Sequence, residues 1–423
     1  MRTAHLVYAV VNMTKRTLFP GLVLSLAAGL AAVPPVVLDA SKLNPADVKK
    51  GVAVLEDGPN FLWAVDADKR PTLFIDGSAV GPMKQARGKG PWIYTGKLQT
   101  GTMHSFYYMI DGKKFGGMTD IPAFGPDSYS QPGVPQGKLS ETFVSLSKLY
   151  PGMKTEYRVY VPAEYDPGTP AALMIWQDGH YHFERDGPLQ IPAGQPPSRV
   201  QNVIDNLTYR KEIPVAIYLL IDPGTVGTTA MRSIQYDTVS DLYPRFLRDE
   251  ILPELYSKYN IRKDGYSHAI AGNSSGGICA FNAAWYMPEL FARVNARIPS
   301  FTALQWKPGV QDGGYIYPFL VRREPKRNIR VWLQDGSEDM ETRPGSWPLQ
   351  SIQMANSLKL GGYDFHFTFG SGTHNHSQNN SELPAVLKWL WRDYDPAKTE
   401  QKFEQDAAEK AKPVFRVKIY NRD

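Results

Sequence analysis

The pentapeptide Gly-Asn-Ser-Ser-Gly at residues 272–276 constrains this chain of 423 residues more than any other feature. The apolar stretch Ser267–Ala271 before it has the composition of a buried strand, and Ser275–Tyr286 after it has a helical pattern. Small residues here allow a strained turn between strand and helix, which exposes the Ser274 hydroxyl at a sheet edge. We therefore predict that Ser274 is a nucleophile. A Gly/Ser-rich turn that only opens a helix is the structural alternative.

The expected helix would also supply donors for an oxyanion. Its N-terminus points free N–H groups, including that of Ser275, at negative charge that develops beside Ser274. A second donor usually comes from the loop after an early strand. The strand-like stretch Ala172–Trp176 ends in Gln-Asp-Gly-His at residues 177–180. We predict an oxyanion hole formed by the backbone N–H groups of Ser275 and Gly179.

A serine hydroxyl needs a base, and the base needs a carboxylate that orients it. With a serine in such a turn, the acid follows a late strand and the histidine lies in the final loop. The strand-like stretches Arg330–Leu333 and Asp364–Phe369 run into the loops at residues 334–339 and 370–374. The first loop is acidic and the second ends in histidine, so both lie where this order requires them.

Each loop offers neighbouring candidates for the acid and the base. Asp339 lies further beyond its strand, where a loop carboxylate can bend toward a histidine. Asp335 precedes a glycine and is typical of the turn itself, and Glu338 is a third candidate. His374 follows the glycine-rich turn directly, whereas His376 lies two residues further on. We predict Asp339 as the acid and His374 as the base.

Two His-x-His pairs support a rival hypothesis, a zinc site, because alternate residues of an extended segment share a face. The pairs are His180 with His182 and His374 with His376. No clear acidic ligand pattern accompanies them. We therefore predict neither a metal nor another cofactor.

Strand and turn signals divide the chain into two main parts. Residues 45–147 contain short apolar runs separated by turns, which is typical of an immunoglobulin-like, all-β antiparallel sandwich. Within them, residues 116–140 are rich in Gly, Pro and Ser and are expected to cross the surface. Residues 148–396 alternate strand-like and helical segments, which predicts one parallel, doubly wound α/β sheet. Residues 397–423 form a charged tail with a possible strand at Val414–Tyr420.

Residues 1–33 have the form of a secretory signal peptide, with Lys15-Arg16 before the apolar run Leu18–Leu30 and prolines after it. The run is shorter than the roughly 20 residues that span a bilayer. After cleavage we expect a secreted or periplasmic protein without membrane contact; an uncleaved anchor is the alternative. Residues 1–32 hold three of the 47 basic residues, and the remaining 44 face 42 acidic ones. This balance argues against nucleic-acid binding.

Several further motifs carry a resemblance to a known family. They are Tyr-Arg-Val-Tyr-Val-Pro at 157–162, Trp-Gln-Asp-Gly at 176–179, Arg-Ser-Ile-Gln-Tyr-Asp at 232–237, Phe-Leu-Arg-Asp-Glu-Ile-Leu-Pro at 246–253 and Gly-Thr-His at 372–374. Residues 148–395 resemble the enterochelin-esterase and esterase-D group of α/β-hydrolases, which includes feruloyl esterases, acetylxylan esterases and mycolyltransferases. The resemblance implies a Ser274, Asp339 and His374 triad. Thr373 departs from the glycine of many relatives.

The segment ahead of residue 148 resembles the early-set, glycogen-binding-like β-sandwich often fused to such esterases. The candidate substrate-binding residues are Arg232, Tyr236, Trp306 and Trp347, in segments expected to flank Ser274. We expect a serine esterase acting on small-molecule or polysaccharide esters, with feruloyl or acetyl groups on carbohydrate favoured. The alternatives are a siderophore trilactone esterase, an acyltransferase, and a glycan-binding protein with an inactive hydrolase domain. The sequence does not constrain the oligomeric state.

Overall fold

A computed structural model describes residues 38–86, 88–191 and 196–416, which belong to one compact unit beginning at Leu38. The predicted signal peptide lies outside these residues. So does most of the expected strand Val414–Tyr420, and its described residues 414–416 are not in a strand. No helix in the described ranges is both long enough and apolar enough to cross a bilayer.

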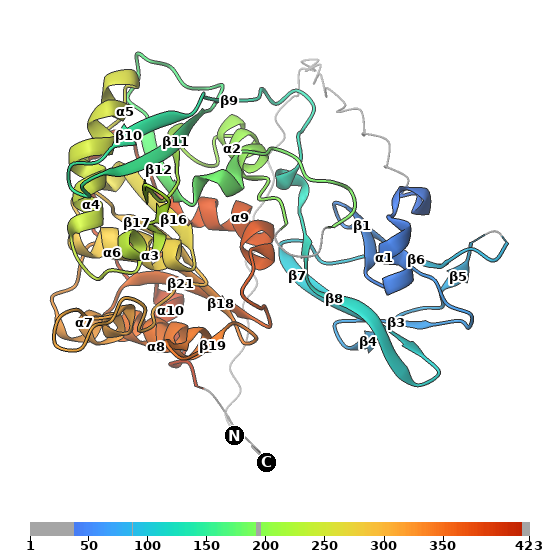
Figure 1. Ribbon diagram of the computed structural model, residues 1–423. Coiled ribbons are helices and arrows are strands. Elements are labelled where there is room, and N and C mark those ends of the chain that lie inside the picture. The colour runs from blue at the N-terminus through green and yellow to red at the C-terminus, as the bar shows by residue number, and fades with distance from the viewer. Residues whose placement is uncertain (1–37, 87, 192–195, 417–423) are drawn as a thin grey trace, which may run out of the picture. The chain divides into compact units, whose positions relative to one another are not determined.

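Six parallel strands form one end of the sheet that carries the candidate site (Figure 1). In spatial order they are β13 (Ala216–Ile221), β12 (Ala172–Gln177), β16 (His268–Asn273), β17 (Arg293–Arg297), β18 (Arg330–Gly336) and β21 (Asp364–Gly370). Every residue of β12, β13 and β16 is buried, as expected where helices cover both faces of a sheet. Because the strands are parallel, the loops after them gather at one edge.

The sheet is mixed at its other end, so the prediction of one parallel sheet is wrong there. Strand β11 (Met153–Val161) runs antiparallel to β13, and the short strands around it also pair antiparallel. These are β9 (Lys138–Leu139), β10 (Phe143–Leu146), β14 (Thr225–Val226) and β15 (Thr229–Ala230). Only residues 147–152 connect β10 to β11. A parallel pair needs a crossover of a dozen or more residues, so this connection allows only antiparallel pairing.

Helices cover the two faces of the sheet with separate apolar clusters. On one face lie α6 (Ser275–Tyr286) and α8 (Trp347–Leu360), and on the other lie α2 (Val200–Tyr209) and α9 (Ser377–Leu390). Residues 242–258 form a continuous helical region that consists of α4 (Leu242–Phe246), a π-helical segment (Leu247–Ile251) and α5 (Leu252–Lys258). Shorter helices are α3 (Arg232–Tyr236), α7 (Tyr317–Arg323) and α10 (Ala407–Ala411).

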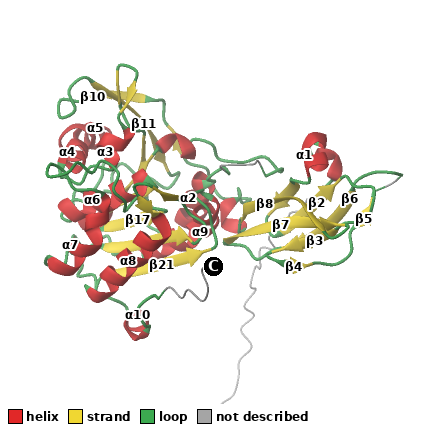
Figure 2. Ribbon diagram, turned by 60° about the horizontal axis from the view of Figure 1, so that its bottom comes forward, coloured by secondary structure: helices red, strands yellow, loops and turns green. Residues whose placement is uncertain are grey.

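The first part of the described chain, which we call the β-region (residues 53–123), contains two four-stranded antiparallel sheets (Figure 2). One consists of β1 (Ala53–Asp57), β2 (Asn60–Val65), β6 (Trp92–Lys97) and β5 (Lys84–Gln85), after helix α1 (Pro45–Lys50). The other consists of β4 (Ser78–Ala79), β3 (Thr72–Ile75), β7 (Thr102–Ile110) and β8 (Lys113–Ala123). Residues of both sheets, including Trp63 and Phe106, share one apolar cluster.

Strand β8 corrects in part the expectation that residues 116–140 cross the surface, because residues 120–123 are buried within it. It pairs with β7 as far as Ala123, although it contains Gly116 and Gly117, both with positive φ. Glycine weakens the sequence signal of a strand. A Cβ at Gly117 would lie 2.3 Å from the carbonyl oxygen of Phe106, so the close approach of β7 and β8 requires glycine there.

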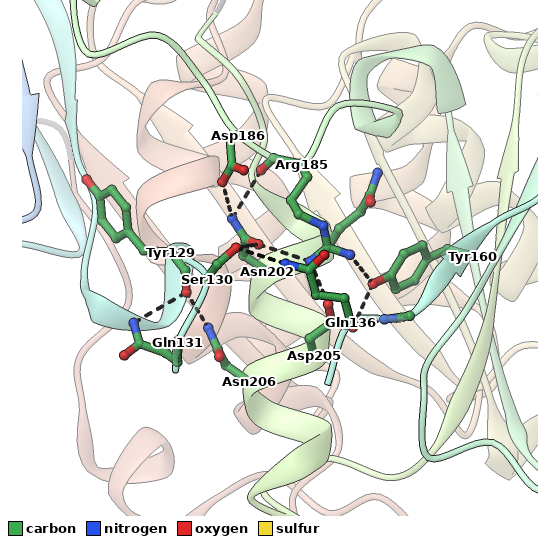
Figure 3. A network of polar contacts seen from close by, with 12 residues as sticks. Tyr129, Ser130, Gln131, Gln136, Tyr160, Arg185, Asp186, Asn202, Asp205 and Asn206 are labelled. Atoms are coloured by element: carbon green, nitrogen blue, oxygen red, sulfur yellow. Dashed lines mark hydrogen bonds and ion pairs between the residues drawn. The ribbon is translucent and has the colours of Figure 1, made fainter. Parts of the chain in front are cut away.

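A buried polar network on α2 holds the connection between the β-region and the mixed sheet (Figure 3). Asp205 on α2 accepts hydrogen bonds from the Tyr160 hydroxyl (2.6 Å) and the Arg185 guanidinium (2.6 Å). It also accepts the backbone N–H of Gly137, in the connecting segment, at 3.1 Å. The Asp205 side chain is almost fully buried, so its charge depends on these donors.

We expect Asp205→Ala to lower the free energy of unfolding by about 3–5 kcal/mol, because it leaves the Arg185 charge and the Tyr160 hydroxyl without their acceptor. Urea titration should show a lower midpoint with an unchanged slope. Asp111→Ala is the matched control, because Asp111 forms an exposed ion pair with Lys69 and its loss should change the midpoint little. Equal midpoints for the two variants would contradict this role of Asp205.

Candidate active site

Ser274 lies in the turn between β16 and α6 with φ 57° and ψ −122°, a conformation that non-glycine residues rarely adopt. The neighbouring strand holds it there: the Ser274 N–H donates to the carbonyl oxygen of Arg297 at 2.9 Å. The Ser274 carbonyl oxygen accepts the N–H of Ser300 at 3.1 Å. A Cβ at Gly272 would lie 2.3 Å from the Gly276 carbonyl oxygen, so the turn excludes a side chain at residue 272.

Two further loops bring a histidine and a carboxylate to Ser274. The Ser274 Oγ lies 2.8 Å from Nε2 of His374, which follows β21. Nδ1 of the same ring lies 2.6 Å from Oδ1 of Asp339, which follows β18. With the proton on Nδ1, the ring donates to the carboxylate and accepts from the serine hydroxyl. The structure therefore brings the three predicted residues into one hydrogen-bonded series.

The alternative acids and base lie elsewhere. The Asp335 carboxylate accepts the Gly336 N–H and contacts Ser351 on α8, and Glu338 is exposed. His376 is buried, with its ring edge-on to Tyr181 at 4.9 Å between centroids, and burial lowers its pKa to about 3.

The loops that carry Asp339 and His374 are bonded to each other. The N–H of Ser337 donates to the carbonyl oxygen of Gly370 at 2.9 Å, and the N–H of Glu338 donates to that of Gly372 at 3.1 Å. A Cβ at Gly336 would lie 2.3 Å from the Gly372 carbonyl oxygen. The spacing of acid and base is therefore set by backbone contacts that only glycine permits.

The predicted oxyanion donors lie on two elements beside Ser274. Ser275 is the first residue of α6, and the first N–H groups of a helix have no partner within it. Gly179 follows Asp178, whose φ is 55°, and a Cβ at Gly179 would lie 2.3 Å from the Leu220 carbonyl carbon. A Cβ at Gly276 would lie 3.0 Å from Oδ2 of Asp178, which places the Asp178 loop against the start of α6.

The candidate substrate-binding residues divide into buried and exposed ones. Tyr236 is 1% exposed and Trp347 is 3% exposed, so both are buried, and their contact with substrate stays a prediction. The Tyr236 hydroxyl accepts the N–H of Asp178 at 3.5 Å, and Trp347 packs edge-on against the His374 ring at 5.8 Å. Tyr236 therefore supports the loop at Asp178, and Trp347 supports His374. Trp306, 49% exposed in the loop after Ser300, stays a candidate for substrate contact.

Arg232 is half-buried and is engaged by the protein itself. Its Nε and Nη2 donate to the two carboxylate oxygens of Asp178 at 2.7 Å and 2.8 Å. Nη2 also lies 3.4 Å from the carbonyl oxygen of Asn273, directly before Ser274. A bidentate pair of this kind fixes orientation as well as charge. Arg232 therefore ties the loop that carries Gly179 to the serine turn.

One neighbour of the site, Asp120 on β8, could not be predicted from any sequence motif. Its carboxylate accepts the N–H of Thr373 at 3.1 Å and the Thr373 hydroxyl at 2.5 Å. Thr373 directly precedes His374. A residue of the β-region thus holds the histidine loop across 253 positions of sequence.

A cavity of about 580 Å³ opens beside His374. Its walls include Phe106, Lys114 and Asp120 from the β-region and Thr373, His374 and Asn375 from the loop after β21. His374, the catalytic-base candidate, lies on its wall, so a group bound in this cavity would lie next to His374.

The paired histidines are accounted for by other contacts. His180 Nδ1 lies 2.6 Å from Asp222, and His182 is buried against Trp176 with ring centroids 4.7 Å apart. The described residues include no group of three or more His, Cys, Asp or Glu side chains placed to hold a metal ion.

Comparison with known proteins assigns the chain to a family. The sequence profile of the family described as "Putative esterase" matches residues 150–390, more than half of the chain. The chain belongs to this esterase family. It is accordingly a carboxylic ester hydrolase, as the resemblance of its motifs predicted.

Individual relatives are distant. The uncharacterized protein YjcH of Bacillus subtilis is 21% identical over 214 residues, which cover 49% of this chain and 80% of that protein. The iron(III) salmochelin esterase of Escherichia coli O6:H1 is 23% identical over 241 residues, 54% of this chain and 53% of that enzyme. This esterase chain thus spans about half the length of the salmochelin esterase.

A crystal structure of the enterochelin esterase from Shigella flexneri superposes with a TM-score of 0.51 at 16% identity. The match covers 81% of this chain and 96% of that one. At this identity the likeness concerns the fold alone. It confirms the predicted α/β-hydrolase-like fold, with a mixed sheet in place of a parallel one.

We expect Asp120→Ala to lower kcat/KM for any ester that the protein cleaves by about 10–100-fold, because Thr373, directly before His374, loses both of its hydrogen bonds to Asp120. Steady-state kinetics beside a thermal melt would separate this effect from loss of folding. Asp111→Ala, an exposed change in the same β-region, should leave the rate unchanged. If a folded Asp120→Ala protein has wild-type kinetics, the loop before His374 keeps its position without Asp120, and the prediction is wrong.

Arg232→Gln should lower kcat about tenfold or more and change KM by less than about threefold, because Arg232 acts through the Asp178 loop. Arg248→Gln is the control, since that arginine forms an exposed pair with Asp249. A raised KM with unchanged kcat would instead restore the direct substrate contact predicted from the sequence.

Proposed function

We propose that the chain is a secreted serine esterase that forms an acyl-enzyme on Ser274. The observation that carries the proposal is the series Ser274 Oγ, His374 Nε2, His374 Nδ1 and Asp339 Oδ1, with contacts of 2.8 Å and 2.6 Å. A nucleophile, a base and an orienting carboxylate in this order are the requirements of acyl transfer through serine.

The steps follow from the positions of these groups. His374 Nε2 takes the proton of Ser274 as Oγ attacks the ester carbonyl carbon, and the carbonyl oxygen becomes an oxyanion. The N–H groups of Ser275 and Gly179 stabilise that charge. When the intermediate collapses, the leaving alcohol takes the proton from His374. Water then repeats the sequence and releases the acid, and Asp339 keeps the imidazolium oriented throughout.

Carbohydrate-linked feruloyl or acetyl esters remain the favoured substrates. Of the residues of the described chain that line the cavity beside His374, Lys114 and Asp120 carry opposite formal charges. Arg232, the nearby guanidinium, is already paired with Asp178. A site with this balance suits a neutral ester better than an iron(III) catecholate complex, which carries several negative charges.

The siderophore esters are the second candidate, and the names of the relatives support them. A salmochelin esterase and an enterochelin esterase are among the matches, and the latter is aligned over 96% of its own length. Transfer of the acyl group to a sugar would use the same intermediate. A glycan-binding protein with an inactive hydrolase domain is the candidate that the hydrogen-bonded series disfavours.

The remaining assignments rest on sequence. We propose residues 1–33 as a signal peptide, 45–147 as an early-set-like sandwich, 148–396 as the catalytic domain and 397–423 as a charged tail, with a secreted or periplasmic location. The two antiparallel sheets of the β-region support the sandwich assignment. Its contact with Thr373 supports a role in the site besides any glycan binding.

We expect the purified protein to cleave p-nitrophenyl acetate, methyl ferulate or acetylated xylan, and Ser274→Ala to lower kcat/KM by about 10⁴-fold or more. Ser337→Ala, an exposed serine in a neighbouring loop, should retain the wild-type rate. A chelator should have no effect. Cleavage that persists in Ser274→Ala would refute the acyl-enzyme.

Substrate class is decided by adding iron-loaded and iron-free enterobactin to the same panel. Faster turnover of the siderophore than of any carbohydrate ester would reverse the favoured assignment. Product analysis with an added sugar acceptor separates hydrolysis from acyl transfer, because only transfer produces a new sugar ester.

A further inference from the structure

The carboxylate of Asp339 uses only one of its oxygens in the contacts to its loop and to His374. Oδ1 accepts Nδ1–H of His374 at 2.6 Å and the N–H of Met340 at 2.5 Å. Oδ2 is buried and has no hydrogen-bond donor. A buried carboxylate oxygen without a donor loses its hydration without compensation, which destabilises the folded protein. We therefore expect a neighbouring group to donate a proton to this oxygen.

The neighbouring group is a second carboxyl, that of Asp335. Asp335 ends β18, and the turn from Gly336 to Asp339, closed by a 3.2 Å backbone hydrogen bond, folds Asp339 back toward it. Asp339 is the group that, after burial, acts most on the Asp335 carboxyl, so the two side chains are neighbours. Asp335 is fully buried. Its Oδ1 accepts the N–H of Gly336 at 2.7 Å, and its Oδ2 accepts the Ser351 hydroxyl from α8.

Two adjacent buried carboxyl groups cannot both be ionised. Asp339 is the one expected to be ionised, because two N–H donors point at its Oδ1. One of these donors is on His374, the catalytic-base candidate. The groups recorded around Asp335 are Asp339, the Ser351 hydroxyl and the Gly336 N–H, none of them a cation. Burial, followed by the contact with Asp339, raises the pKa of Asp335 well above its usual range.

We propose that Asp335 is a positioning residue that carries a proton and donates it to Oδ2 of Asp339. The inference rests on the proposed roles of Asp339 and His374 and extends them by one residue. The acid of the triad is thereby held from both sides, by His374 at Oδ1 and by Asp335 at Oδ2. Because Asp335 is neutral, it fixes Asp339 without adding a second negative charge near the imidazole.

Two variants separate this role from a purely structural one. Asp335→Asn keeps an N–H donor and stays neutral, whereas Asp335→Ala removes the donor. The fall of kcat/KM at low pH, the acid limb of its pH profile, reports protonation of the essential base. Without a donor at Oδ2, the negative charge of Asp339 is less neutralised and stabilises the His374 imidazolium more strongly. The pKa of His374 should therefore rise. We expect Asp335→Ala to move that limb to higher pH and to lower kcat about tenfold, and Asp335→Asn to lower kcat less and leave the limb in place.

The opposite shift would overturn the proposal. If Asp335 were ionised, Asp335→Asn would remove a negative charge and move the acid limb to lower pH. Identical profiles for the two variants would mean that the donor has no effect on His374. Asp395→Asn and Asp395→Ala, at a residue with a partly exposed carboxylate in a distant loop, form the control pair and should match the wild type.

A spectroscopic measurement tests the proton without any substrate. The infrared difference spectrum of wild type minus Asp335→Asn at neutral pH should contain the carbonyl stretch of a protonated carboxyl group, and the same band should remain in a Ser274→Ala background. Its absence would overturn the proposal even if the enzyme is active. Its presence would support the proposal even if no ester is cleaved. If Asp335→Asn does not fold, wild type minus Asp339→Asn serves instead, because the band must shift when its acceptor changes.

Discussion

The backbone of Ser274 is held at a positive φ by contacts on both sides of the serine turn. The carbonyl of Arg297 on β17 accepts its N–H, Ser300 donates to its carbonyl, and Gly272 allows the turn to close on Gly276. Strain of this kind persists only where the surrounding structure over-determines it. Once it is fixed, the hydroxyl projects at the edge of the sheet and α6 begins directly behind it.

The other groups reach Ser274 because the strands are parallel. β12, β18 and β21 all end at the same edge as β16, so the loops with Gly179, Asp339 and His374 meet there. Each loop is then fixed by a polar contact: Arg232 binds Asp178, a second carboxyl lies behind Asp339, and Asp120 binds Thr373. Rigid support of this kind is what precise positioning of reacting groups requires.

Local sequence patterns predicted most elements of the mixed sheet. Helix α6 begins and ends at the expected residues, because its helical pattern and the small residues of the turn before it are properties of the segment itself. Strand β17 was not predicted. Three residues of its sequence Arg-Val-Asn-Ala-Arg are polar, yet all five are buried. Arg297 packs over the Trp176 ring, and Arg293 donates to the carbonyl oxygen of Leu390. Only the folded chain supplies those partners.

For the site, the sequence by itself determined the strand–turn–helix serine and the order of serine, acid and histidine. It left Asp335 and Asp339 as alternatives, and the three-dimensional structure gives them different positions: one contacts His374 and the other lies behind it. Tertiary structure alone decided that Tyr236 and Trp347 are buried and that Asp120 reaches Thr373. The physical reason is the range of the interactions. Turn and helix propensities act between near neighbours, whereas burial and carboxylate partners depend on residues that meet only when the sheet has formed.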